Sequence, residues 1–148
     1  MAGISAMPIQ FPVRPGTILL CNYATGFRPP EMVKRRPVIV VSPCLPHRDR
    51  LCAVAPLSTT APAREVPYIC RLELRIPLPP PFGALVCWAK ADVIATMGFD
   101  RLDLFRTKRD FSGKRKYLHP RISDDDLRRV RVAVLHGLGL GGLTMHLP

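Results

Sequence analysis

The apolar residues of this chain come in short runs separated by prolines and glycines, and this pattern limits the folds open to it. The chain contains 17 prolines, and a proline in the middle of a strand cannot donate a ladder hydrogen bond. The runs between these breaks have the length and β-branched composition of strands. We expect five strands, at Thr17–Tyr23, Pro37–Val41, Leu51–Leu57, Tyr68–Leu74 and Ala84–Lys90.

One α-helix is expected late in the chain, at about 124–138. Ser123 is a suitable N-cap, and Asp126 three residues later gives a capping-box-like pattern. Residues at helical spacing predict the buried face: Leu127, Val130, Val134 and Leu138. Three arginines fall on the other, solvated face: Arg128, Arg129 and Arg131. The sequence therefore predicts a mainly β protein, with a highly curved antiparallel sheet or small barrel and a C-terminal helix.

Composition indicates a globular protein with a strongly basic surface. Hydrophobic residues make up 47% of the 148 residues, enough for the core of one domain. The net charge of +11 favours a nucleic-acid partner, because each phosphate that a protein neutralises releases a counterion. General solubility and a docking surface for an acidic protein are the alternatives. With no membrane-spanning segment and no signal peptide in the sequence, we expect a soluble, cytoplasmic protein.

We expect a single domain at 15–140, between a flexible N-terminal arm at 1–14 and a tail at 141–148. Pro77–Phe82 is expected to be a polyproline-like connector, because its prolines cannot enter a sheet. The basic segment Lys108–Lys116 contains Ser112-Gly113 and is expected to be a hairpin tip or a phosphate-contacting loop.

The five cysteines lack the short spacings of a zinc site or a redox dithiol. Four of them fall within expected strands, where a reduced cysteine behaves as a small hydrophobic residue: Cys21, Cys52, Cys70 and Cys87. We therefore expect no disulfide, no metal and no cofactor.

The stretch Glu31–Val41 is the clearest functional feature of the sequence. An isolated acid is followed by three cations, Lys34, Arg35 and Arg36, which lead directly into an apolar strand. A buried strand is a stiff platform for a charged group. A guanidinium at its start is therefore a binding group or a catalytic one, unless Arg36 is simply a surface cation.

Several segments, taken in chain order, form a recognisable set: Arg14–Leu20, Glu31 five residues before Arg36-Pro37, Val38–Val41, Leu51–Ser58 and Val86–Thr96. Together with the late helix, they resemble the PemK/MazF family of toxins from toxin–antitoxin systems. The resemblance implies an SH3-like β-barrel of the PemK/MazF/CcdB kind, usually a homodimer. It also implies an endoribonuclease that cleaves single-stranded RNA without a metal, leaving a 2′,3′-cyclic phosphate and a 5′-hydroxyl. The usual partner is a small acidic antitoxin.

The resemblance also assigns the groups that act on the phosphate. Arg36 stands where the family has its essential arginine, and its forked donors suit the charge that develops on the phosphoryl oxygens. Ser58 matches the hydroxyl residue at the end of a family strand, with Thr59 as its substitute. Alternatively, Ser58 has only a structural role and caps a turn with Thr59 and Thr60.

A general base and a proton donor are also needed. Glu31 and Asp92 are equal candidates for the base, and Lys90, two residues before Asp92, could supply a positive charge or a proton. Alternatively, Glu31 only pairs with a neighbouring cation and Asp92 is only a turn residue. The expected RNA-backbone contacts are Lys34, Arg35, Thr59, Lys108 and Arg109.

Three aromatic residues, Trp88, Phe99 and Phe105, could stack on bases, but core packing is the more common use of aromatics in a small barrel. Two functions compete with RNA cleavage. One is non-catalytic nucleic-acid binding by the same fold. The other is a gyrase-targeting toxin, which the sequence resembles less because the chain ends His-Leu-Pro and not Trp-Gly-Ile.

Overall fold

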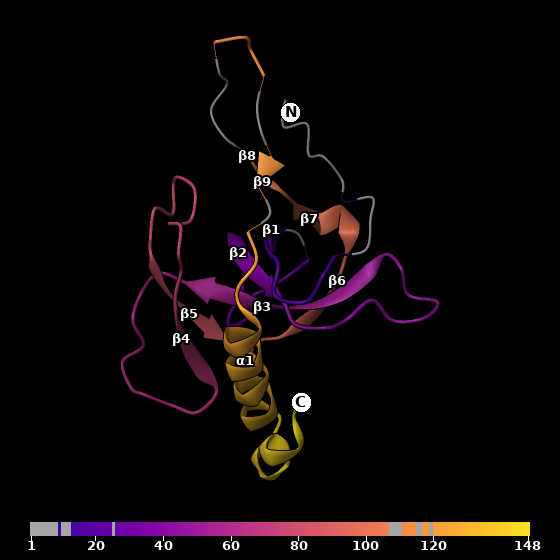
Figure 1. Cartoon of the computed structure of the whole chain (residues 1–148), viewed down its shortest axis with the longest axis vertical. Coiled ribbons are helices and arrows are strands. Elements are labelled where there is room, and N and C mark those ends of the chain that lie inside the picture. Colours follow the sequence, from indigo (N-terminus) through magenta and orange to yellow (C-terminus); the bar gives the residue numbers. More distant parts are fainter. Residues whose placement is uncertain (1–8, 10–12, 25, 107–110, 115–116, 119) are drawn as a thin grey trace.

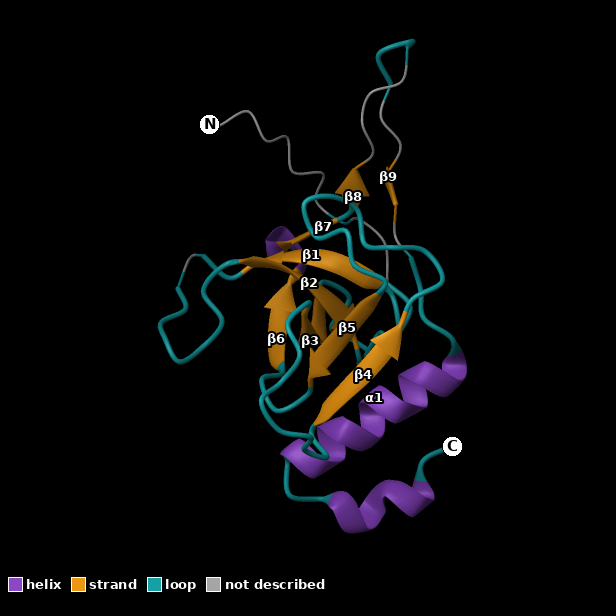
Figure 2. Ribbon diagram, turned by 90° about the vertical axis from the view of Figure 1, so that its left-hand side faces the viewer, coloured by secondary structure: helices purple, strands orange, loops and turns teal. Residues whose placement is uncertain are grey.

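The structure is a computed structural model that describes residue 9 and residues 13–24, 26–106, 111–114, 117–118 and 120–148. Over these residues a curved antiparallel sheet is packed against one α-helix, α1 (Asp124–Gly137) (Figure 1, Figure 2). The strands are β1 (Ile18–Asn22), β2 (Arg35–Val40), β3 (Leu51–Ser58), β4 (Ile69–Glu73), β5 (Val86–Lys90), β6 (Ala95–Gly98), β7 (Leu102–Asp103), β8 (Phe105–Arg106) and β9 (Tyr117–Leu118).

In the described part of the chain, seven strands form one sheet in the order β4-β5-β3-β2-β1-β7, with β6 also paired to β3. The long strand β3 joins two halves, because its first half pairs with β6 and its last residues pair with β5. The described strands leave this sheet open and do not close it into a ring, and β8 pairs with β9 separately. The expected fold class, mainly β with a C-terminal helix, is confirmed.

The two faces of the sheet carry separate core clusters, as the alternation of side chains along a strand requires. Ile18 and Ile39 belong to the first cluster, which packs against α1. Leu19 and Val38 belong to the second, on the opposite face. Strand β2 is therefore buried on both faces beyond its first two residues. This double burial makes it the rigid platform that its β-branched sequence predicts.

Helix α1 begins as predicted, since the backbone N–H of Asp126 donates to the Ser123 hydroxyl over 3.1 Å. Leu127 and Val130 are buried as expected. The expectation for Leu138 was wrong, because the helix ends at Gly137 and Leu138 is 56% exposed. Ala133 is buried on the helix face instead. Two of the arginines on this helix also reach back to the sheet: Arg129 donates to the carbonyl of Arg71, and Arg131 to that of Val41.

The structure adds elements that the sequence did not indicate. Strand β6 was not among the five expected strands. After it, a 3₁₀ helix at Phe99–Arg101 is followed by the short strands β7 and β8. A second 3₁₀ helix, Gly141–His146, lies in the expected tail. Ile9 and Val13, within the expected arm, are buried in the second cluster.

The two expected loop segments differ in how much of each the structure describes. Pro77–Phe82 is a loop that buries Leu78 in the first cluster, whereas Lys108–Lys116 lies largely outside the described residues. All five cysteines are free thiols; Cys44 is exposed and the other four are buried. No helix in the described part of the chain is long and apolar enough to cross a membrane.

Candidate nucleic-acid interface

Strand register brings three predicted or possible site residues to neighbouring positions on one face of the sheet. Val38 of β2 pairs with Pro56 of β3, so the next residues on that face of the two strands are Arg36 and Ser58. Ser58 in turn pairs with Trp88 of β5, and Trp88 pairs with Arg71 of β4. We call the four residues the cross-strand row: Arg36, Ser58, Trp88 and Arg71.

Arg36 is held half-buried at the start of β2, with the buried part of that strand behind it. Its Nε is buried and has no hydrogen-bond partner among the described residues. A buried N–H without an acceptor is costly, and a cationic one more so than a neutral one. A phosphoryl oxygen is the kind of acceptor that a guanidinium binds best. The local geometry therefore suits an anion at Arg36.

Tyr23 is a neighbour of Arg36 that the sequence reasoning missed. Cys21 pairs directly with Arg36, and Tyr23, the residue after the end of β1, is buried in the same core cluster as Cys21. The Tyr23 hydroxyl is also buried without a partner among the described residues. Burial raises the pKa of Tyr23, and the Arg36 charge opposes that shift only weakly. Tyr23 is therefore a neutral hydroxyl beside the guanidinium at neutral pH.

Ser58 is buried at the end of β3, where its hydroxyl bonds within its own turn. The hydroxyl donates to the carbonyl of Thr60 over 3.2 Å and accepts from the N–H of Thr60 over 3.1 Å. The turn-capping role left open by the sequence is thus present, and Thr59 is exposed beside it. Lys90 is half-buried two residues after Trp88, so it projects from the same face as the row.

The two candidate bases lie in loops, outside the cross-strand row. Glu31 is exposed, and its carboxylate accepts the backbone N–H of Arg28 over 2.8 Å, which closes the turn of its own loop. Asp92 is exposed in the turn between β5 and β6. A Cβ added to Gly137 would lie 3.0 Å from the Cα of Asp92, so this turn sits against the C-terminal end of α1.

The expected RNA-backbone contacts have different surroundings. Lys34 is exposed, whereas the Nη2 of Arg35 lies 3.7 Å from the Oδ2 of Asp103, a carboxylate with 7% side-chain exposure. Asp103 was not anticipated, because only the pairing of β7 with β1 brings it to this end of β2. Lys108 and Arg109 lie outside the described residues.

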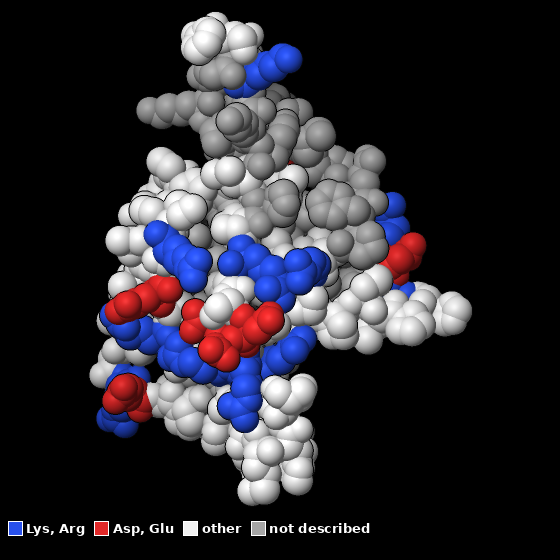
Figure 3. Space-filling model, in the orientation of Figure 1, with Lys and Arg blue, Asp and Glu red and all other residues white. Residues whose placement is uncertain are grey.

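Cationic side chains gather on the face that carries α1 and the adjacent edge of the sheet, with carboxylates among them (Figure 3). A cavity of about 650 Å³ opens on this edge and reaches the row at Trp88 and Arg71. Three of its lining residues are arginines and one is an acid, Glu65. The row therefore extends from Arg36, whose buried Nε suits an anion, to a cavity lined by more arginines than acids.

Comparison with known proteins identifies the family to which this chain is similar. The model of the PemK-like, MazF-like toxins of type II toxin–antitoxin systems matches residues 14–135. The protein YifN of Escherichia coli (strain K12) is 30% identical over an alignment of 123 residues, and the match covers 71% of this chain and 81% of YifN.

Solved structures share the fold. MazF from Deinococcus radiodurans has a TM-score of 0.61 at 20% identity, covering 88% of this chain and 99% of that one. An endoribonuclease from a mycobacterial species, solved in complex with its cognate antitoxin, has a TM-score of 0.57 at 22% identity, covering 86% and 96%. The chain belongs to the family of PemK-like, MazF-like toxins of type II toxin–antitoxin systems.

Proposed function

We propose that this protein is an endoribonuclease toxin that cleaves single-stranded RNA by attack of a 2′-hydroxyl on the adjacent phosphorus. The observation that carries the proposal is Arg36, whose buried Nε has no acceptor among the described residues and which stands beside Ser58 in register. Membership of the toxin family and the endoribonuclease names of similar structures support the same conclusion.

In the proposed reaction the 2′-oxygen forms a bond to phosphorus while the bond to the 5′-oxygen breaks. The products are a 2′,3′-cyclic phosphate and a 5′-hydroxyl. Charge builds on the phosphoryl oxygens, and Arg36 stabilises it through its forked N–H donors. Arg36 is not the proton donor, because a guanidinium pKa above about 12 is poorly matched to neutral pH. Ser58 binds the same phosphate after exchanging a bond within its turn.

Proton transfer is assigned to the remaining candidates. Lys90 projects from the face of the row, so it can approach the leaving 5′-oxygen and supply charge or a proton. Glu31 and Asp92 remain the two candidates for the base. Each lies in a loop, so either would reach the 2′-hydroxyl only with RNA bound or after a shift of its loop. Lys34, Arg35 and Thr59 are proposed to contact the RNA backbone.

The proposed regulator is a small acidic antitoxin, and the proposed assembly is a homodimer. A chain with a net charge of +11 is electrostatically suited to an acidic partner. One of the similar structures was solved with its cognate antitoxin.

The test is incubation of the purified protein with a long single-stranded RNA in EDTA, followed by analysis of the fragment ends. We expect fragments with 2′,3′-cyclic phosphate and 5′-hydroxyl ends. The same RNA with 2′-O-methyl groups should stay intact, because the nucleophile is blocked. Fragments that still form from the methylated RNA, or equally with Arg36→Ala, would refute the mechanism. An intact natural RNA would refute the activity itself.

A further inference from the structure

Of the three aromatic residues that the sequence offers for stacking on bases, Trp88 is the one that the core leaves out. Phe99 and Phe105 are 5% and 1% exposed and belong to the second and first core clusters. Trp88 is half-buried and is a member of neither cluster. The expectation of core packing is therefore confirmed for the two phenylalanines and is wrong for Trp88. An indole that does not stabilise the core has a face available for another contact.

Trp88 lies between a hydroxyl and a cation of the cross-strand row. It pairs with Ser58 on one side and with Arg71 on the other. Directly opposed residues in antiparallel strands have their Cβ atoms about 5 Å apart. A group that rests on the indole is thus one strand away from Ser58 and two strands away from Arg36.

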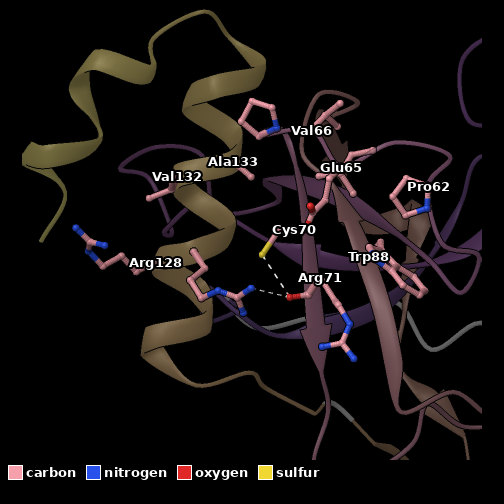
Figure 4. Close-up of a pocket in the computed structure, with 12 residues that line it drawn as sticks. Pro62, Glu65, Val66, Cys70, Arg71, Trp88, Arg128, Val132 and Ala133 are labelled. Carbon is pink, nitrogen blue, oxygen red and sulfur yellow. Dashed lines mark hydrogen bonds between the residues drawn. The ribbon is translucent and has the colours of Figure 1, made fainter.

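The cavity beside β4 gives this indole a concave setting. Figure 4 shows Pro62, Trp88 and Arg71 following one another along the side of the cavity opposite α1, with Glu65 above them. The helix side of the cavity is cationic, and there Arg129 donates to the carbonyl of Arg71 over 2.9 Å. An aromatic wall in a cationic hollow suits a flat ring that carries an anionic phosphate.

Arg71 is available to bind that phosphate. Its Nη2 lies 2.9 Å from the Oε1 of Glu73, but the two side chains are 52% and 69% exposed. Exposed ion pairs contribute little to stability, so a phosphate can replace this carboxylate at small cost. The guanidinium also has the planar fork that binds phosphate through two N–H donors.

We propose that Trp88 and Arg71 form a nucleobase subsite next to the phosphate site of Arg36 and Ser58. An unpaired base of single-stranded RNA stacks on the indole, and its backbone phosphate binds Arg71. The proposal builds on the proposed RNA substrate but does not require cleavage. Because every base has a π-face, stacking here adds affinity with little choice between bases. Sequence preference then arises elsewhere in the site.

Trp88 is the single tryptophan of the chain, so its fluorescence reports this subsite directly. The experiment titrates the protein with a mixed-sequence 2′-O-methyl oligonucleotide, which cannot be cleaved by the proposed reaction, at fixed low salt. We expect saturable quenching of the emission. The same oligonucleotide, labelled and followed by anisotropy, gives the affinity of variants that lack the indole.

We expect Trp88→Ala to bind about 5- to 150-fold more weakly, as loss of one stacked base predicts. Trp88→Phe should recover most of the affinity, Trp88→Leu should not, and Arg71→Ala should weaken binding. Arg48→Ala, an exposed loop arginine outside the cavity, is the charge-matched control and should bind nearly as the wild type does. Circular dichroism of each variant checks that the fold is intact.

The outcomes separate this subsite from the cleavage proposal. Quenching without any cleavage of natural RNA supports the subsite and refutes the nuclease. Cleavage of RNA with unchanged Trp88 emission on binding, or equal affinity of Trp88→Leu and Trp88→Phe, refutes the subsite and leaves the nuclease standing. Absence of oligonucleotide binding, with quenching by an acidic peptide alone, assigns the cavity to a protein partner and overturns the proposal.

Discussion

Replacement of Gly137 by alanine is a sharp test of how α1 supports the turn that carries Asp92. In an open helix position this change would stabilise the protein, because alanine favours the helix over glycine by about 1 kcal/mol. Here the added Cβ would lie 3.0 Å from the Cα of Asp92 and 3.2 Å from the carbonyl oxygen of Ala91. Both neighbours are backbone atoms, which cannot rotate away as a side chain can.

Overpacking of this kind costs about 1–3 kcal/mol, so it outweighs the gain in helix propensity. We expect Gly137→Ala to lower the free energy of unfolding by about 1 kcal/mol, or the melting temperature by about 2–4 °C for a chain of this length. The measurement is urea or thermal unfolding followed by circular dichroism. The matched control is Gly142→Ala, whose Cβ would meet nothing within 4 Å.

Equal or higher stability of Gly137→Ala relative to the wild type would refute this reasoning. It would mean that the β5–β6 turn does not pack on the end of α1 as described. A shift of the turn would also move Asp92. The same variant should therefore lose RNA cleavage beyond its loss of stability if Asp92 is the base, and should keep its cleavage rate if Glu31 is.

Three further predictions concern stability and the thiols. Arg131→Met should destabilise the protein by about 1.5–3 kcal/mol, because the carbonyl of the buried residue Val41 loses a charged donor at 3.1 Å. Arg128→Met, on the exposed face of α1, should change the free energy of unfolding little. Ser123→Ala should cost about 1 kcal/mol in the same unfolding assay, through loss of the helix cap. A thiol reagent at pH 8 should label Cys44 rapidly in the native protein and all five cysteines after denaturation; rapid labelling of more than one native thiol would contradict the buried assignments.

Alkaline pH should destabilise the protein through the same thiols. Burial raises the pKa of Cys52 and that of Cys87 from the ordinary value of 9.0 to about 11. The native state therefore retains these protons at a pH where the unfolded chain releases them. Stability from this source is complete below about pH 9 and declines as pH rises toward 11. Unfolding free energies measured across this range should show a smaller decline in the double variant in which both cysteines are alanine.

Local patterns were sufficient to predict the longer elements of the fold. The five longer strands and α1 each have a continuous apolar pattern or a cap that acts over a few residues, as Ser123 does. Strand β6 lacks such a signal, since Ala95–Gly98 is short and includes a glycine, and its pairing with β3 provides the support. Leu138 fitted the helical spacing, but the helix ended one residue before it.

The arrangement of the site depends on contacts between distant segments, which a single sequence does not contain. Arg36 and Ser58 could each be selected from a motif, but their adjacency follows from the pairing of Val38 with Pro56. Trp88 could not be distinguished from a core aromatic until its exclusion from both clusters was known. Asp103 was missed for the same reason, since its contact with Arg35 depends on the pairing of β7 with β1.

The most direct test of the central claim is the single-turnover rate of RNA cleavage by Arg36 variants in EDTA. We expect Arg36→Ala to cleave about 10²–10³-fold more slowly than the wild type, the usual cost of removing one preorganised donor from a developing charge. Arg36→Lys should recover only part of the rate, because an ammonium lacks the planar fork. Arg48→Ala should cleave at the wild-type rate. Cleavage by Arg36→Ala within a few-fold of the wild-type rate, with the fold intact, would contradict the account.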